Sequence, residues 1–175
     1  MKIVEQFFTK VNQTLPKIRK NFWPTSDIDE QSLKNLKAQA TILIKFHEGV
    51  RLKPYMDSVN KLTVGVGRNL VDVGLSEAEV EILLENDINR VITELLTAIP
   101  WFSSLDLPRQ LVLVDMCFNL GLKKFMEFRK TLELIQKGEY EKAGDEMIVS
   151  KWAIQVGQRA IRLSEIMRTG KINIK

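Results

Sequence analysis

Cysteine and histidine are almost missing from this 175-residue sequence, which has one of each. Cys117 has no partner for an internal disulfide. It lies in the apolar segment V-L-V-D-M-C-F, which favours a buried structural thiol over a nucleophile. A single histidine, His47, argues against a multi-histidine metal site and a serine-type triad. We therefore expect no metal and no cofactor, and neither a zinc enzyme nor a serine or cysteine hydrolase.

Long apolar runs are also missing. No run approaches the roughly 20 residues that span a bilayer, and charged or polar residues interrupt every apolar cluster after Lys2, so no signal peptide is predicted. We expect cytoplasmic synthesis, with any target beyond the membrane reached by another route. The apolar fraction of 45% indicates a globular chain of one domain, or one domain with two lobes.

Positive charge is concentrated at the N-terminus. Residues 1–23 hold five bases and one acid, and this excess equals the net charge of +4 of the whole chain. Apolar residues recur there near helical spacing, although Pro16 would kink a helix. The segment is either a helix packed on the core or a basic amphipathic segment that contacts a membrane surface. Residues 121–175 are also basic, which suits an anionic polymer or a solvated surface.

The segment from Lys45 to Leu70 carries the candidate chemistry. A helix over about 29–48 is expected to end at Gly49. Glu48 then lies on the apolar stripe of that helix and at the negative end of its dipole. Apolar surroundings and a helix C-terminus both favour a protonated carboxyl, which suits a general acid. A surface glutamate at a helix end is the alternative interpretation.

A turn and a short strand follow. Asp57 lies in a cluster of turn residues, and T-V-G-V-G reads as a strand. Alternation places Thr63, Gly65 and Gly67 on one face, which would be bare enough for a large ligand to approach the backbone. An acid, a second carboxylate and a positioned hydroxyl are the groups that glycosidic bond hydrolysis needs.

The rest of the chain reads as helical. Ser76 and Glu79 form a capping box, Pro108 suits the first turn of an apolar helix that ends near Gly121, and further helices are expected over 125–137, 139–150 and 156–168. The predicted fold class is α+β, mainly α. It comprises a helix leading into a small β lobe, then a helical bundle, with a cleft between the lobes.

These motifs resemble the phage-type (T4-like) lysozymes of glycoside hydrolase family 24. An E-x8-D-x5-T pattern falls on Glu48, Asp57 and Thr63, with Y-x-D at 55–57 and T-x-G-x-G at 63–67. Downstream, the resemblance includes M-C-F-N-L-G at 116–121, and it covers about residues 38–172. It continues through Trp152, Arg159, Arg162 and R-T-G at 168–170.

The resemblance implies hydrolysis of the β-1,4 bond between N-acetylmuramic acid and N-acetylglucosamine in peptidoglycan. Glu48 would protonate the leaving oxygen, while Asp57 and Thr63 would hold the attacking water in an inverting mechanism. Arg159 would lie near Glu48 and lower its pKa, opposing the effect of burial. Three further residues would line the substrate cleft: Phe118, Asn119 and Lys151.

The resemblance also implies an organisation and a setting. Residues 1–37 would be an N-terminal helical extension, and 38–175 a lysozyme-like catalytic domain with a β lobe at about 49–75 and a helical lobe at about 76–175. The protein would be a monomer made in a host bacterium, would act on peptidoglycan glycan strands after release, and would bind no nucleic acid. A non-catalytic glycan-binding or structural module of the same fold is the alternative.

Two residues depart from the family pattern. Arg68 stands where relatives usually carry histidine, so the family's histidine–acid pair is not available in that form. Asn60 replaces the usual turn glycine, and asparagine tolerates the positive φ that such a turn needs. We expect catalysis to survive both departures.

Overall fold

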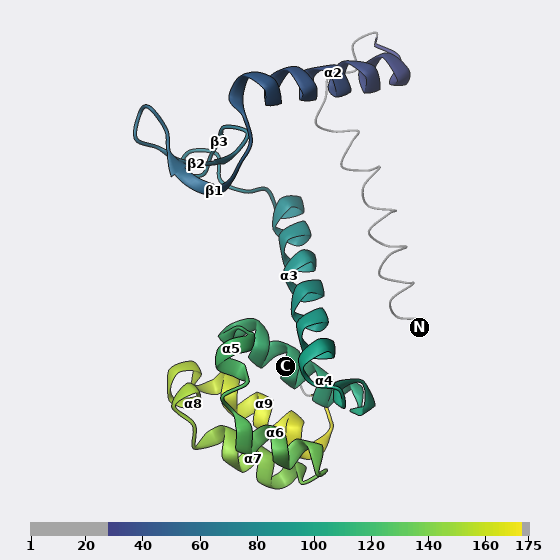
Figure 1. Ribbon diagram of the computed structural model, residues 1–175, viewed down its shortest axis with the longest axis vertical. Helices are drawn as coiled ribbons and strands as arrows, with labels where there is room; N and C mark the ends of the chain where they lie inside the picture. The colour runs from purple at the N-terminus through teal and green to yellow at the C-terminus, as the bar shows by residue number, and fades with distance from the viewer. Residues whose placement is uncertain (1–27, 173–175) are drawn as a thin grey trace. The chain divides into compact units, whose positions relative to one another are not determined.

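The computed structural model describes residues 28–172 and divides the chain into two units, residues 1–74 and 75–175 (Figure 1). Residues 1–23, for which a packed helix and a membrane-contacting segment were both considered, lie outside the described residues. Between residues 28 and 172, no helix is long and apolar enough to cross a membrane.

The first unit contains one long helix and a small sheet. Helix α2 (Glu30–Glu48) begins after Asp29, whose carboxylate accepts the Ser32 N–H at 2.9 Å, and it ends at Gly49. The helix expected over 29–48 is thus confirmed. Strands β1 (Arg51–Met56), β2 (Leu62–Gly65) and β3 (Arg68–Asn69) follow as an antiparallel sheet in the order β1-β2-β3.

The turns of this sheet depend on backbone conformations that few residues adopt. Asn60 has a φ of 62° in the β1–β2 turn, which confirms that asparagine can serve there. The expectation that Thr63, Gly65 and Gly67 share one strand face is wrong for Gly67. Strand β2 ends at Gly65, and the positive φ of both glycines, 70° and 80°, turns the chain into β3.

The second unit is helical. Its capping box is confirmed, because the Ser76 hydroxyl accepts the Glu79 N–H while the Glu79 carboxylate accepts the Ser76 N–H. Pro108 lies in the first turn of α4, and Gly121 ends that helix as expected. The elements are α3 (Glu77–Ala98), the 3-10 turn η1 (Phe102–Ser104), α4 (Leu107–Leu120), α5 (Leu122–Phe125), α6 (Arg129–Gln136), α7 (Tyr140–Ile148), α8 (Lys151–Val156) and α9 (Gln158–Thr169).

Two helices of this unit are shorter than the apolar pattern suggests. The segment expected as one helix over 125–137 contains the end of α5, a short connection and then α6. The last helix begins at Gln158 instead of 156, because Gly157 adopts φ 52° and ψ −118° and separates it from α8. Those angles break the helical path, and only glycine adopts them without strain.

The apolar core of the described residues lies entirely in the second unit, between Val91 and Met167. Its fully buried large side chains come from α3, α4, α5, α6, α7 and α9. In the described part of the first unit, Thr63 is the one buried residue. The fold class is confirmed as α+β and mainly helical, with a small antiparallel sheet.

Candidate active site

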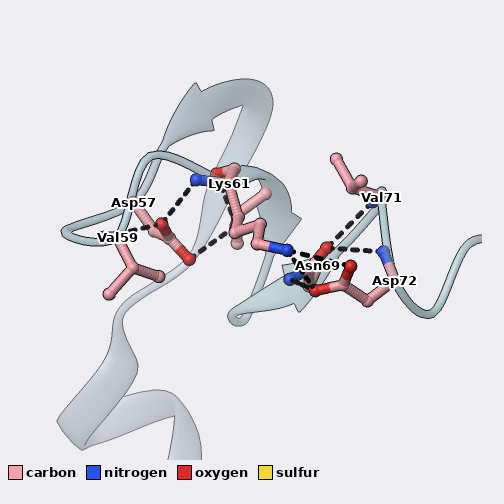
Figure 2. Close-up of polar contacts among 7 residues, drawn as sticks. Asp57, Val59, Lys61, Asn69, Val71 and Asp72 are labelled. Atoms are coloured by element: carbon pink, nitrogen blue, oxygen red, sulfur yellow. Dashed lines mark hydrogen bonds and ion pairs between the residues drawn. The ribbon is translucent and has the colours of Figure 1, made fainter.

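Asp57 and Thr63 meet at the β1–β2 turn. Asp57 directly follows β1, and its Oδ1 accepts backbone N–H groups from Val59 at 3.0 Å and from Lys61 at 2.8 Å (Figure 2). The Thr63 hydroxyl lies 3.5 Å from Asp57 Oδ2 and 3.1 Å from the Lys61 carbonyl oxygen. The backbone N–H groups of the turn therefore fix the Asp57 carboxylate, which lies beside the Thr63 hydroxyl.

Burial distinguishes the two groups. Thr63 is only 2% exposed, whereas Asp57 is half-buried. In the sheet, Thr63 pairs with Tyr55 of β1 and with Asn69 of β3. A central strand flanked on both sides holds the threonine rigidly, and a rigid element positions a reacting group more closely than a loop does.

Glu48 is the last residue of α2 and is exposed. A β-carbon added at Gly67 would lie 3.8 Å from Glu48 Oε2, so the carboxylate lies beside the β2–β3 turn. The apolar surroundings expected for Glu48 are not supplied by α2, which has no buried residue. Within the first unit, the structure therefore places Glu48 near one end of β2 and the Asp57–Thr63 pair near the other.

The second unit holds the residues expected to line a substrate site. Phe118 and Asn119 are exposed near the end of α4, and Lys151 is exposed at the start of α8. The Asn119 side-chain oxygen accepts a hydrogen bond from Trp152 Nε1 at 2.9 Å. Trp152 in turn packs edge-on against Phe128, with ring centroids 6.1 Å apart. Asn119 is therefore held in place, with its oxygen fixed by the buried indole.

Arg159 has a partner that the sequence pattern did not reveal. Its Nε donates to Asp115 Oδ1 at 2.7 Å, and its Nη2 lies 3.4 Å from the Asp115 carbonyl oxygen. The signal in the sequence was a lone carboxylate inside the apolar segment 112–118. The interaction expected between Arg159 and Glu48 stays a prediction.

Three more polar residues near the first-unit site were also missed. Lys61 Nζ contacts both carboxylate oxygens of Asp72, at 3.0 and 2.9 Å, and Asn69 Nδ2 donates to the same carboxylate at 2.9 Å (Figure 2). Arg68 Nη1 donates to the Gly74 carbonyl oxygen at 3.3 Å. Over residues 28–172, no group of three or more His, Cys, Asp or Glu side chains is arranged to hold a metal ion.

Comparisons with known proteins relate the chain to lysozymes. The family model described as phage lysozyme matches residues 45–167. Probable T4-type lysozymes 1 and 2 of Dictyostelium discoideum are 27% and 24% identical to the chain, covering 75% and 74% of it and 94% of each relative. The pre-baseplate central spike protein Gp5 of Enterobacteria phage T4 is 24% identical over 85% of the chain, which corresponds to 30% of that protein.

Proposed function

Because the chain belongs to the phage lysozyme family and is a glycoside hydrolase of the lysozyme type, we propose how its residues divide the reaction. Its muramidase activity cleaves the β-1,4 bond between N-acetylmuramic acid and N-acetylglucosamine. Glu48 protonates the leaving glycosidic oxygen. Asp57 and Thr63 hold a water on the opposite face of the sugar, and that water attacks the anomeric carbon with inversion.

The pairing of Asp57 with Thr63 carries this proposal. A carboxylate beside a hydroxyl can accept a proton from water while the hydroxyl orients the same water, as a general base needs. Thr63 is fixed in the central strand. Asp57 Oδ1 accepts two backbone N–H groups, whereas Oδ2 faces the Thr63 hydroxyl at 3.5 Å. That oxygen is therefore the one available to a water.

The second unit supplies the binding groups in this proposal. Phe118, Asn119 and Lys151 contact the glycan strand, and Arg159 orients the Glu48 carboxylate. Asp115 holds the Arg159 guanidinium through Nε and, at its carbonyl oxygen, through Nη2, so Nη1 is the nitrogen that can donate to a second carboxylate. The physiological role that fits is breakdown of a host bacterial cell wall after release of the enzyme, by a monomer that needs no cofactor.

The decisive experiment compares the wild type with Glu48→Gln in clearing outer-membrane-permeabilised bacteria. Glutamine keeps the shape of the side chain but cannot donate the proton, so we expect activity to fall at least about 100-fold. Glu30→Gln, at the exposed first turn of the same helix, is the matched control and should retain full activity. Equal clearing by the wild type and Glu48→Gln would overturn the assignment of the acid.

The reaction products distinguish a muramidase from enzymes with related activities. Mass spectrometry should find fragments with reducing muramic acid ends, whereas anhydro ends would indicate a lytic transglycosylase. Proton NMR during hydrolysis should show the α anomer first, because inversion converts a β linkage into an α product. Binding to peptidoglycan without turnover would instead support a non-catalytic module, and cleavage of chitin alone would change the substrate.

A further inference from the structure

The backbone of one residue, Lys61, holds both members of the proposed water-binding pair. Its N–H donates to Asp57 Oδ1 at 2.8 Å, and its carbonyl oxygen accepts the Asp57 N–H at 3.0 Å. The same carbonyl lies 3.1 Å from the Thr63 hydroxyl. A shift of the Lys61 backbone would therefore move the carboxylate and the hydroxyl together.

The side chain of Lys61 is anchored on a different turn. Its ammonium contacts both oxygens of Asp72, eleven residues further along the chain, at 3.0 and 2.9 Å (Figure 2). Asp72 also accepts a hydrogen bond from Asn69 Nδ2 at 2.9 Å. Asn69 Oδ1 accepts the N–H groups of Val71 at 2.8 Å and Asp72 at 2.9 Å, which fixes the segment that carries the carboxylate.

This arrangement differs from an ordinary surface ion pair. The side chains of Lys61 and Asp72 are 40% and 54% exposed, and an isolated pair of that kind contributes little to stability. Here the carboxylate is shared by two donors, and one of them, Asn69, pairs directly with Thr63 across β2 and β3. The network therefore ties the β1–β2 turn to the strand beside the buried threonine.

We propose that Lys61, Asp72 and Asn69 are positioning residues for the reaction, because they hold the Asp57–Thr63 pair in the geometry that binds the attacking water. None of the three touches the substrate in this proposal. Their effect is on the rate of the chemical step, because a misplaced water leaves substrate binding unchanged but attacks the anomeric carbon more slowly. The inference rests on the proposed function.

The test uses the full-length protein and four variants: Lys61→Met, Lys61→Arg, Asp72→Asn and the double variant Lys61→Met/Asp72→Asn. We expect Lys61→Met and Asp72→Asn each to lower kcat about tenfold. This loss is smaller than the ~100-fold loss in rate that a 1 Å misplacement of a reacting group causes. KM should stay within about twofold, because only the transition state is affected. The double variant should lose no more than the worse single one, as two members of one network do.

Two variants serve as controls. Lys61→Arg keeps the charge and the bond to Asp72, so kcat should remain within about twofold of the wild type. Lys53→Met removes an exposed lysine from β1 of the same sheet and should change nothing. A similar loss in Lys53→Met would show that general positive charge matters, and would overturn the positioning role.

Amide hydrogen exchange distinguishes a local loosening of the turn from a general loss of stability. In Lys61→Met and Asp72→Asn, the N–H groups of Val59 and Lys61 should exchange faster, since both donate to Asp57. The Leu70 N–H, which bonds the Leu62 carbonyl at 2.8 Å, should keep its protection. Faster exchange of all three, with a lower Tm, would mean general destabilisation and would overturn the proposal.

The outcomes separate the two proposals. An inactive wild type would refute the proposed function, and the exchange of Val59 and Lys61 would still decide whether the ion pair fixes the turn. An active wild type with unchanged kcat in both single variants would refute the positioning role and leave the hydrolase assignment intact.

Discussion

Cys117 shows at the residue scale how burial changes chemistry. The side chain is fully buried in α4, and burial raises the pKa of its thiol to about 11, with a smaller contribution in the same direction from the Glu94 carboxylate. A thiolate there would lose its hydration, and the Arg90 guanidinium, which lowers the pKa, has a smaller effect than burial. The thiol is therefore a structural group, as its apolar sequence neighbours predicted.

This shift in pKa makes stability depend on pH. The unfolded thiol ionises near pH 9.0 while the folded one holds its proton to about pH 11. Stability from this group is thus complete below pH 9 and decreases as pH rises towards 11, by about 2–3 kcal/mol in total. Urea unfolding of the wild type and Cys117→Ala at pH 8 and pH 10 should show the steeper loss in the wild type. Parallel losses would contradict the prediction.

Site residues that lie close together in the sequence could be predicted, whereas partners far apart in the sequence could not. Glu48, Asp57 and Thr63 lie within sixteen consecutive residues, so their pattern was visible in the sequence. The partner of Arg159 lies 44 residues away, and the partner of Lys61 lies across a strand turn. Such pairs depend on register and helix packing, which residue spacing does not determine.

At the scale of elements, the packing of α7 against α9 depends on a close approach at Gly144. A β-carbon there would lie 2.6 Å from Arg168 Cγ and 3.0 Å from the Ser164 carbonyl oxygen. Arg168 can move, but the carbonyl belongs to the α9 backbone. The short distance between α7 and α9 therefore requires glycine at position 144, although alanine has the higher helix propensity.

We predict that Gly144→Ala destabilises the protein. Overpacking costs about 1–3 kcal/mol, and the better helix propensity of alanine offsets about 0.5–1 kcal/mol of it, so the net loss should be about 1 kcal/mol and at most about 2.5 kcal/mol. Thermal unfolding measures it. In an Arg168→Ala background the penalty should shrink, because one of the two clashing groups is gone. A stabilised Gly144→Ala variant would show that α7 and α9 separate freely.

Elements were predicted best where their ends are fixed locally. The capping box at Ser76, Pro108 in the first turn of α4 and glycine after α4 act through neighbouring residues, and the corresponding helices were found. Helices α5 and α8 were missed because they are only four and six residues long. Short helices contain too few apolar residues for a helical period to be recognised. The boundary between α8 and α9 is set by the backbone angles of Gly157, which the sequence pattern does not reveal.

At the scale of the whole molecule, the two units differ in how much they bury. Every buried apolar residue between 28 and 172 belongs to residues 75–175. A unit of that size with its own core is able to fold alone. The described part of the first unit buries only Thr63, so its sheet depends on hydrogen bonds and turn geometry.

We therefore predict that a fragment comprising residues 75–175 folds cooperatively without the rest of the chain. Circular dichroism should show a helical spectrum and a single sigmoidal thermal transition. A fragment comprising residues 28–74 should show no such transition, because a small sheet and one helix without a core are not stable in water. A gradual, non-cooperative melt of residues 75–175 would contradict this division.

The backbone angles of Gly157, between α8 and α9, select the configuration of the residue that can lie there. A β-carbon at Gly157 would meet no atom within 4 Å, so space is not what excludes a side chain there. The obstacle is handedness: φ 52° with ψ −118° is strained for an L-residue, while its mirror image is ordinary extended backbone. These backbone angles would not strain a D-residue, and glycine is the genetically encoded residue that adopts them at the lowest cost.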